Sequence, residues 1–347
     1  MSSSIGAVQR VGIVGASGFT GAELLRIIDR HPLLTATVLQ ASSQAGQQVA
    51  ALYPALTAAV GDAVFDAVDV DALDGLDVVV LGLPHEASLA MVPSLEGRVG
   101  CVVDLSAAFR LKNPSDYTKY YGFTHEQPEA LARAVYGLPE FHRSELAGAS
   151  LIATPGCYVT AAILALRPLT QANVVDTVGV IVDAASGVTG AGRKEDLAYS
   201  FTTVDENFTA YGLLQHRHTP EMEQEIGAQL LFTPHLAPMN RGILATCYSR
   251  PVDDNAVSTA SVLDVLRNAY RNEPFVHVID GIPGTKATMG SNLALVTGRY
   301  DERTRTVVTM CAIDNLTKGA SGGAIQALNV ALGFDEACGL DRIGVAP

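Results

Sequence analysis

The sequence predicts an α/β protein of two domains: a parallel sheet with helices around it, then an α+β domain with a mostly antiparallel sheet. Three observations lead to this prediction. In the first half, apolar segments of strand length alternate with segments of helical periodicity, as in parallel sheets. In the second half, β-branched segments follow one another with few helices between them, which favours antiparallel pairing. The 347 residues suffice for two hydrophobic cores.

A glycine-rich turn joins the first expected strand, residues 10–14, to a helical segment over residues 22–29. Its glycines follow a Gly-x-x-Gly-x-x-Gly pattern. In such a turn the first glycine permits the tight bend, the second lets a pyrophosphate approach the backbone, and the third lets the helix pack close to the strand. The alternative is a plain glycine-rich turn. The pattern predicts a Rossmann-type dinucleotide site with contacts from Gly15, Ser17, Gly18, Phe19, Thr20 and Gly21.

The end of the next strand, expected over residues 35–41, bears on the choice of dinucleotide. An NAD site usually places an acidic residue there to accept from the ribose 2′-hydroxyl. This sequence instead has Ser42 and Ser43. A carboxylate would repel a 2′-phosphate, whereas hydroxyls and backbone amides would not, so the sequence favours NADP as the cofactor. Serines in an ordinary surface turn are the alternative.

Two further strands, expected over residues 77–83 and 99–104, complete the parallel sheet. The loops after such strands border the ligand crevice. Arg110 lies in the second loop and is a candidate partner for a phosphate or carboxylate, because a guanidinium group matches the geometry of both anions. A surface arginine is the alternative. Residues 113–150 are polar and interrupted, which predicts a connection between the domains.

Cys157 lies where a turn meets a helix. Pro155 and Gly156 force the turn, an apolar segment of helix formers follows, and Pro168 is expected to end it. Backbone N–H groups and the positive end of the helix dipole would stabilise a thiolate at this position. A thiolate is a competent nucleophile toward an activated carbonyl carbon. The alternative is a small cysteine packed in a turn.

The second domain is expected to contain a long strand over residues 174–184 and a helix near residues 258–271. Further strands are expected near residues 229–236, 242–250, 291–299 and 305–313. A final helix over residues 320–332 should return to the first domain. The predicted boundaries are therefore 1–152 plus 319–347 for the NADP-binding domain and 153–318 for the catalytic domain.

Two loops of this domain carry candidate binding residues. Residues 186–194 follow a strand and offer backbone amides and two cations for nicotinamide or phosphate. In the second loop, His216 and His218 flank an arginine, and Thr219-Pro220 is typical of a helix start. An imidazole at the mouth of a cleft titrates near neutral pH. Structural histidines are the alternative.

The composition narrows the class of function. A formal net charge of −13 argues against nucleic acid and anionic membrane surfaces as partners, because both would be repelled. The five cysteines lack paired spacing, which indicates a reducing compartment and no zinc site. Neither a signal peptide nor a membrane-spanning segment is expected. We therefore expect a cytoplasmic enzyme that acts on a small molecule and holds no metal.

The motifs together resemble the N-acetyl-γ-glutamyl-phosphate reductase family, which is related in fold to aspartate-semialdehyde dehydrogenase. The resemblance extends in order over segments 15–23, 104–111, 136–140, 155–168, 186–194, 216–221 and 314–319. It implies reduction of N-acetyl-glutamyl 5-phosphate by NADPH to N-acetyl-glutamate 5-semialdehyde and phosphate, in arginine biosynthesis. It also implies that Cys157 is the nucleophile and His218 the general acid/base, in a homodimer or homotetramer.

The remaining assignments follow from this chemistry. The substrate has two anionic ends, so Arg110 and Lys194 are assigned to its phosphate or carboxylate. His216 and Glu221 are further candidate substrate contacts, and Glu221 could instead orient an imidazole. Ser186, Gly187 and Asn315 are candidate nicotinamide contacts. Two alternatives stay open: a related acyl-phosphate reductase for an aspartate-semialdehyde or aminoadipate-type substrate, and an NADP-binding regulator in which Cys157 is merely packed.

Overall fold

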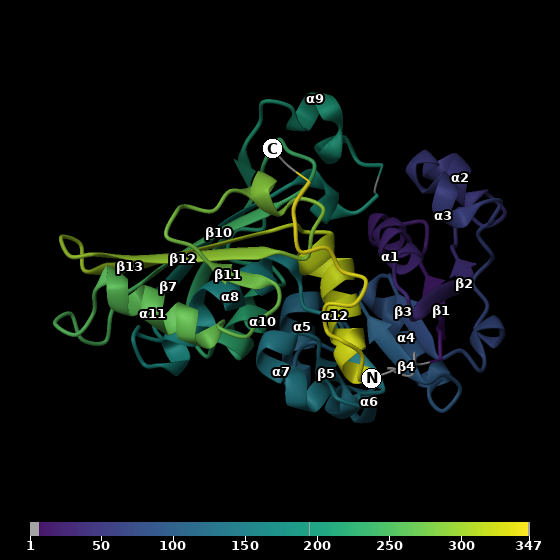
Figure 1. Ribbon diagram of the computed structural model, residues 1–347, viewed down its shortest axis with the longest axis horizontal. Helices are drawn as coiled ribbons and strands as arrows, with labels where there is room; N and C mark the ends of the chain where they lie inside the picture. The colour runs from purple at the N-terminus through teal and green to yellow at the C-terminus, as the bar shows by residue number, and fades with distance from the viewer. Residues whose placement is uncertain (1–6, 194, 346–347) are drawn as a thin grey trace, which may run out of the picture. The chain divides into compact units, whose positions relative to one another are not determined.

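The computed structural model describes residues 7–193 and 195–345, which divide into two compact units (Figure 1). The first unit contains residues 7–112, 126–155 and 320–340, and the second contains residues 113–125, 156–319 and 341–345. The sequence-based boundaries had assigned residues 113–125 and the segment after residue 340 to the first domain. Residues 113–125 and 341–345 instead belong to the second unit.

A six-stranded sheet forms the centre of the first unit, in the order β2-β1-β3-β4-β6-β5. All of its neighbouring strands are parallel, which confirms the predicted architecture. Its middle strands β3 and β4 are buried along their whole length, as expected where helices cover both faces. The strands are β1 (Gln9–Val14), β2 (Leu34–Gln40), β3 (Val78–Leu81), β4 (Cys101–Asp104), β5 (Val135–Tyr136) and β6 (Leu151–Ala153).

Helices α1 (Phe19–Asp29) and α12 (Gly322–Ala331) share one hydrophobic core with these strands. The final helix thus belongs to the first unit, as predicted, although a π-helical turn, Thr317–Ser321, precedes it. The segment predicted to be a connection between domains is folded and contributes α5 (Pro114–Tyr121), α6 (Pro128–Arg133), β5 and α7 (Pro139–Leu146). The other helices of the unit are α2 (Val49–Leu52), α3 (Thr57–Val60) and α4 (His85–Leu95).

The second unit contains a seven-stranded sheet in the order β11-β12-β13-β10-β7-β9-β8. Two neighbouring pairs, β11–β12 and β7–β9, are parallel, and the others are antiparallel, so the mostly antiparallel sheet is confirmed. The predicted long strand starts later than expected, because Val175 makes only an isolated bridge to Pro251. The strands are β7 (Val180–Ser186), β8 (Thr209–Ala210), β9 (Leu230–Leu236), β10 (Ile243–Ser249), β11 (Val276–Val278), β12 (Ala294–Asp301) and β13 (Thr306–Ile313).

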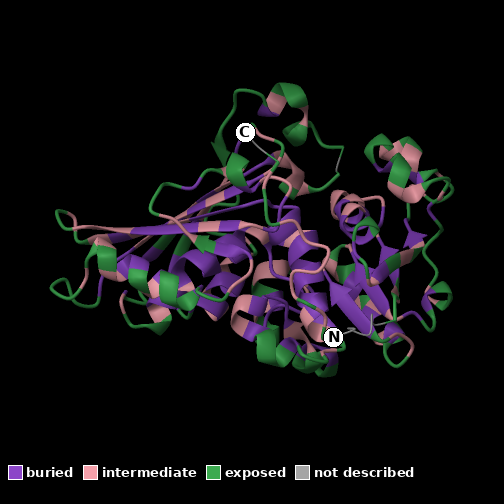
Figure 2. Ribbon diagram, viewed as in Figure 1, coloured by how far each residue is buried: buried purple, intermediate pink, exposed green. Residues whose placement is uncertain are grey.

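Helices α8 (Cys157–Gln171) and α11 (Thr259–Ala269) lie along one face of this sheet (Figure 1). Residues along β7 and β10 alternate between buried and more exposed (Figure 2), which is typical of a sheet covered mainly on one face. The other helices of the unit are α5 (Pro114–Tyr121), α9 (Phe201–Val204) and α10 (Thr219–Ile226). Within the ranges that the structure describes, none of the helices has the length and apolar character needed to cross a membrane.

The prediction that Pro168 ends the helix after Cys157 is wrong, because α8 continues to Gln171. Proline has no amide hydrogen, so the carbonyl of Leu164, four residues earlier, loses its helical donor. The hydroxyl of Tyr270, just after α11, donates to that carbonyl at 2.7 Å. A tertiary hydrogen bond thus replaces the missing helical one and lets α8 run its full length.

Candidate functional site

Cys157 is the first residue of α8, and Gly156 is the N-cap with extended backbone angles (φ −66°, ψ 146°). The side chain of Cys157 is partly exposed, whereas the residues that follow it in the first two turns are buried. The first N–H groups of a helix have no acceptor within the helix, and the helix dipole favours negative charge at this end. The sequence therefore places a thiol where a thiolate and a developing oxyanion are both stabilised.

His218 lies beside this helix start. It is the N-cap residue of α10, where Pro220 follows in the first turn. A Cβ atom added at Gly156 would lie 2.5 Å from Nε2 of His218. The imidazole therefore packs against the backbone of the residue before Cys157, and the structure brings the two predicted catalytic residues together.

Glu221 belongs to the same group of residues. It lies in the first turn of α10, its side chain is fully buried, and its Oε1 accepts a hydrogen bond from the amide of Gly156 at 3.0 Å. The carboxylate thus contacts the backbone of the turn that carries Cys157.

His216 packs behind His218. Its Nδ1 accepts a hydrogen bond from the backbone amide of His218 at 3.2 Å, and its ring meets that of Tyr158 edge-on, with centroids 5.9 Å apart. Burial and, to a smaller extent, the charge of Arg217 lower the pKa of His216 to about 4. At neutral pH His216 is therefore an uncharged hydrogen-bonding group, not a cation for the substrate.

Two tyrosines of this region were not identified from the sequence. Tyr158 donates to the carbonyl of His235 at 2.8 Å, and Tyr211 donates to the hydroxyl of Tyr158 at 3.2 Å. Burial raises the pKa of Tyr158 above its usual range and that of Tyr211 to about 12. Both phenols are therefore protonated at neutral pH. The sequence signal that could have identified Tyr158 as part of the site is its position directly after Cys157.

The predicted nicotinamide contacts of the second unit lie in one corner. Asn315 accepts from the amide of Gly242 at 2.7 Å and donates to the hydroxyl of Thr189 at 2.9 Å. A Cβ atom at Gly190 would meet Oγ of Ser186 at 2.9 Å and Nδ2 of Asn315 at 4.0 Å. The amide of Asn315 thus holds the loop that follows Ser186 and Gly187.

Gly319, another residue not identified from the sequence, packs directly on the candidate nucleophile. A Cβ atom at Gly319 would come within 2.8 Å of Cβ of Cys157. The segment before it is fixed by Asp314, which is fully buried and pairs with Arg241 at 2.9 Å. A side chain at position 319 would therefore displace Cys157.

The glycine-rich turn of the first unit fits a dinucleotide phosphate. Gly15 has φ +86°, and a Cβ atom there would lie 2.3 Å from the carbonyl oxygen of Gly82. A Cβ atom at Gly21 would lie 2.3 Å from the carbonyl oxygen of Ala16. Gly18 is the N-cap of α1, and Ser17, Phe19 and Thr20 are partly exposed. The backbone at the helix start can therefore receive an anion.

The four remaining predicted anion or ribose contacts lie in different parts of the chain. Ser42 and Ser43 are exposed just after β2. Arg110 is only 8% exposed and donates to the carbonyl of Leu105 at 2.8 Å. It follows the buried Asp104, whose pKa is raised by burial and lowered in part by hydrogen bonds from Ser106 and Ser88 and by the charge of Arg110. Lys194 lies outside the described residues.

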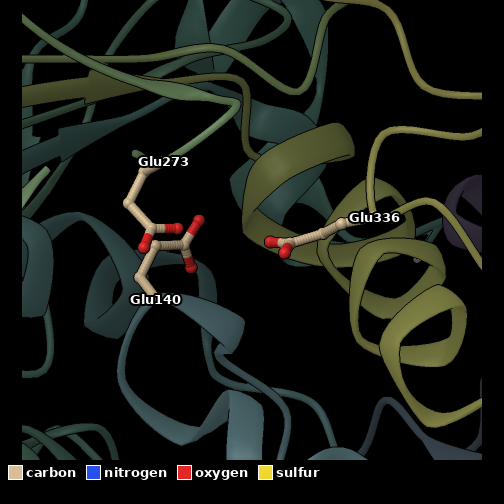
Figure 3. Close-up of side chains that lie close together, drawn as sticks. All are labelled: Glu140, Glu273 and Glu336. Atoms are coloured by element: carbon tan, nitrogen blue, oxygen red, sulfur yellow. The ribbon is translucent and has the colours of Figure 1, made fainter. Parts of the chain in front are cut away.

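An acidic group of the first unit has a structural explanation. Figure 3 shows Glu140, Glu273 and Glu336. Glu140 and Glu336 belong to the first unit, and Glu273 belongs to the second. Gln326 donates to both Glu140 and Glu336, at 2.9 and 2.8 Å. Arg143 pairs with Glu336 at 2.9 Å. Glu140 and Glu336 thus have side-chain hydrogen-bond partners within the first unit.

Comparisons with known proteins match most of the chain. The family model described as the semialdehyde dehydrogenase NAD binding domain matches residues 10–149, and that described as the semialdehyde dehydrogenase dimerisation domain matches residues 157–315. N-acetyl-γ-glutamyl-phosphate reductase of Symbiobacterium thermophilum is 44% identical over 344 residues, covering 96% of this chain and 98% of the relative. The enzyme of the same name from Acidothermus cellulolyticus is 46% identical over 352 residues, covering 97% and 99%.

Solved structures share the fold at low sequence identity. Aspartate semialdehyde dehydrogenase II of Vibrio cholerae, complexed with ASA, gives a TM-score of 0.70 at 16% identity and covers 94% of this chain and 98% of its own. Aspartate semialdehyde dehydrogenase of Candida albicans, with NADP, gives a TM-score of 0.69 at 15% identity, covering 93% and 98%. The predicted fold class is confirmed.

Proposed function

Because the chain belongs to the N-acetyl-γ-glutamyl-phosphate reductase family, we propose that it reduces N-acetyl-L-glutamyl 5-phosphate to N-acetyl-L-glutamate 5-semialdehyde and phosphate. The family is one of phosphorylating semialdehyde dehydrogenases that use a nicotinamide cofactor. The observation that carries the proposal is the thiol of Cys157 at the start of α8 with the imidazole of His218 against the adjacent backbone. The reaction would serve arginine biosynthesis in the cytoplasm.

The chemistry begins with a covalent step. The thiolate of Cys157 attacks the acyl carbon, a C–S bond forms, and the C–O bond to phosphate breaks, so that phosphate leaves and a thioester remains. The nicotinamide cofactor supplies a hydride to the thioester carbon when it is bound. The hemithioacetal oxyanion then re-forms the carbonyl as the C–S bond breaks, and protonated His218 gives its proton to the departing sulfur. The products are the aldehyde and the free thiol.

A backbone N–H at the start of α8 can stabilise the oxyanion. The amide of Gly156 already donates to Glu221, so it is not this donor. We assign the role to the amide of Cys157, the first residue inside the helix. Loss of one such donor costs roughly 3–4 kcal/mol of barrier in other enzymes.

NADP is proposed as the cofactor. The turn around Gly15 and Gly18 and the start of α1 would hold its pyrophosphate. The exposed hydroxyls of Ser42 and Ser43 follow β2 and would receive the 2′-phosphate without charge repulsion. In the second unit, the corner formed by Ser186, Gly187 and Asn315 would contact the nicotinamide.

Two cations, Arg110 and Lys194, are proposed to hold the anionic ends of the substrate. The uncharged state of His216 supports the assignment of this role to Arg110 and Lys194, because a neutral imidazole cannot neutralise a phosphate or carboxylate. His216 is proposed to contribute hydrogen bonding beside His218.

The protein is proposed to act as a homodimer or homotetramer. Ile181 on β7 and Leu231 on β9 are register partners, 37% and 44% exposed. Their neighbours along each strand are buried, so the two side chains share the face of the sheet opposite the one that α8 covers. A second copy that covered this face would remove an apolar surface from water, and sedimentation velocity would detect the assembly.

The test is reduction of NADP⁺ by N-acetyl-L-glutamate 5-semialdehyde with and without phosphate. We expect turnover that requires phosphate or arsenate. Cys157→Ser should lose about 10³-fold or more and His218→Asn about 10²- to 10⁴-fold, while both retain the NADP-dependent rise in melting temperature. Turnover without phosphate, or full activity of the serine variant, would overturn the mechanism. Better turnover with aspartate semialdehyde would favour the alternative substrate class.

A further inference from the structure

Glu221 is placed to hold the active-site turn and not to contact the substrate. Its side chain is 0% exposed. It lies three residues after His218, the N-cap of α10. A glutamate at this helix position commonly reaches back to the amide of its own N-cap residue. Here its Oε1 accepts from the amide of Gly156, the N-cap residue of another helix, at 3.0 Å.

We propose that Glu221 is a positioning residue that fixes the first turn of α8, and with it Cys157, relative to His218. The inference rests on the proposed function and replaces an expectation from the sequence, in which Glu221 was a candidate substrate contact. Its carboxylate joins the turn before Cys157 to the helix that starts at His218. Charge-assisted hydrogen bonds to a backbone N–H are among the stronger ones in proteins.

A second contact makes this bond important for geometry. The space that a Cβ atom would take at Gly156 is filled by the ring of His218, at 2.5 Å from Nε2. Gly156 therefore packs against the ring of His218 on its Cα side and donates its amide hydrogen to Glu221. A small rotation of this residue changes the position of the adjacent thiol relative to the imidazole.

The two helices are held together independently further along. Arg167 of α8 pairs with Glu225 of α10 at 2.7 Å, and Thr170 donates to the carbonyl of Ile226 at 2.7 Å. Without Glu221 these contacts still dock α10 on α8. The effect of losing Glu221 should therefore be confined to the first turn, which separates a positioning role from a role in folding.

The experiment compares Glu221→Gln, Glu221→Asp and Glu221→Ala. Glutamine keeps an acceptor oxygen at the same reach without the charge. Aspartate keeps the charge but is one methylene shorter, and alanine has no acceptor. We expect glutamine to stay within about threefold of the wild-type kcat and the other two to lose roughly 10- to 100-fold in kcat, with KM changed by less than about twofold. Glu225→Gln is the matched control, a buried carboxylate of the same helix, and should lower the melting temperature with little change in kcat.

A second measurement does not depend on the substrate. Hydrogen exchange of a peptide that contains Gly156 should be faster in the alanine and aspartate variants than in wild type and the glutamine variant, because the amide loses its acceptor. Unchanged exchange and unchanged kcat in Glu221→Ala would overturn the proposal, and so would a raised KM with wild-type kcat, which indicates a substrate contact. If wild type shows no phosphate-dependent turnover, the proposed function fails while the exchange measurement still decides the role of Glu221.

Discussion

The absence of a side chain at Gly156 is as important to the site as the side chains around it. The residue precedes Cys157, the proposed nucleophile, and its missing Cβ leaves room for the imidazole of His218. Its φ of −66° is open to any residue, so backbone strain is not the reason for glycine here. The reason is the close approach of the His218 ring to the backbone.

Gly156→Ala should therefore damage catalysis through a single methyl group. The added carbon would lie 2.5 Å from Nε2 of His218, so the ring must move away from Cys157. We expect kcat to fall by about 10²-fold and NADP binding to persist. Gly281→Ala is the matched control, because a Cβ atom there meets nothing within 4 Å. Wild-type kcat in Gly156→Ala would show that the ring can move without cost.

His216 predicts how stability depends on pH. Its pKa is about 4 in the folded protein, lowered by burial and by Arg217, and about 6.5 in the unfolded chain. Between these values the unfolded state binds more protons, so the free energy of unfolding falls as the pH drops through this window.

From pH 7 to pH 5 the expected loss from His216 is about 2 kcal/mol. His216→Gln should remove this part of the dependence in urea unfolding measured at both pH values. His31, whose pKa burial also lowers, contributes in the same direction and remains in the variant. Equal pH dependence of wild type and variant would contradict the prediction.

At the scale of elements, sequence patterns located the strands in which apolar and polar residues alternate and the strands that are continuously apolar. β1, β2, β9, β10 and β13 were all expected within two residues of their observed bounds. The short strands β5, β6, β8 and β11 were missed because two or three residues carry no periodicity. Their pairing is decided by neighbours far away in the sequence.

The end of α8 shows why local rules fail at a tertiary contact. Pro168 signals a helix end, because proline leaves the carbonyl of Leu164 without its helical donor. The hydroxyl of Tyr270, more than a hundred residues later, supplies the replacement hydrogen bond. The same limit applies to the site. Cys157 and His218 have local signals, a turn and a helix start, whereas the burial of Glu221 and its bond to Gly156 join two distant segments.

Tyr270→Phe should accordingly destabilise the protein. It leaves the buried carbonyl of Leu164 without its donor, at a cost of about 1–3 kcal/mol. The control is Tyr300→Phe, since the hydroxyl of Tyr300 donates to Asp254 in an exposed position at 3.3 Å, and its effect should stay within about 0.5 kcal/mol. Urea unfolding of both variants measures the difference. Equal stabilities would mean that α8 tolerates the proline without Tyr270.

At the scale of the whole molecule, the problem is to bind anions with an acidic protein. The net charge is −13, and several arginines are already paired within the fold. Arg167 pairs with Glu225, Arg241 with Asp314, and Arg143 with Glu336. In the proposed NADP site, the cofactor phosphates depend on backbone amides at the start of α1 and on the lack of a carboxylate after β2, both of which act locally.

Ser42→Asp tests this dependence. The exposed side chain after β2 would gain a carboxylate without a steric clash, so binding of NADP should weaken and that of NAD should be affected less. The measurement is the rise in melting temperature with each dinucleotide, which reports the differential affinity through mass action. Ser94→Asp, at an exposed position on α4, changes the net charge equally and should leave both shifts as in wild type. If the two variants weaken NADP equally, the total charge governs binding, and the hydroxyls after β2 do not select the dinucleotide.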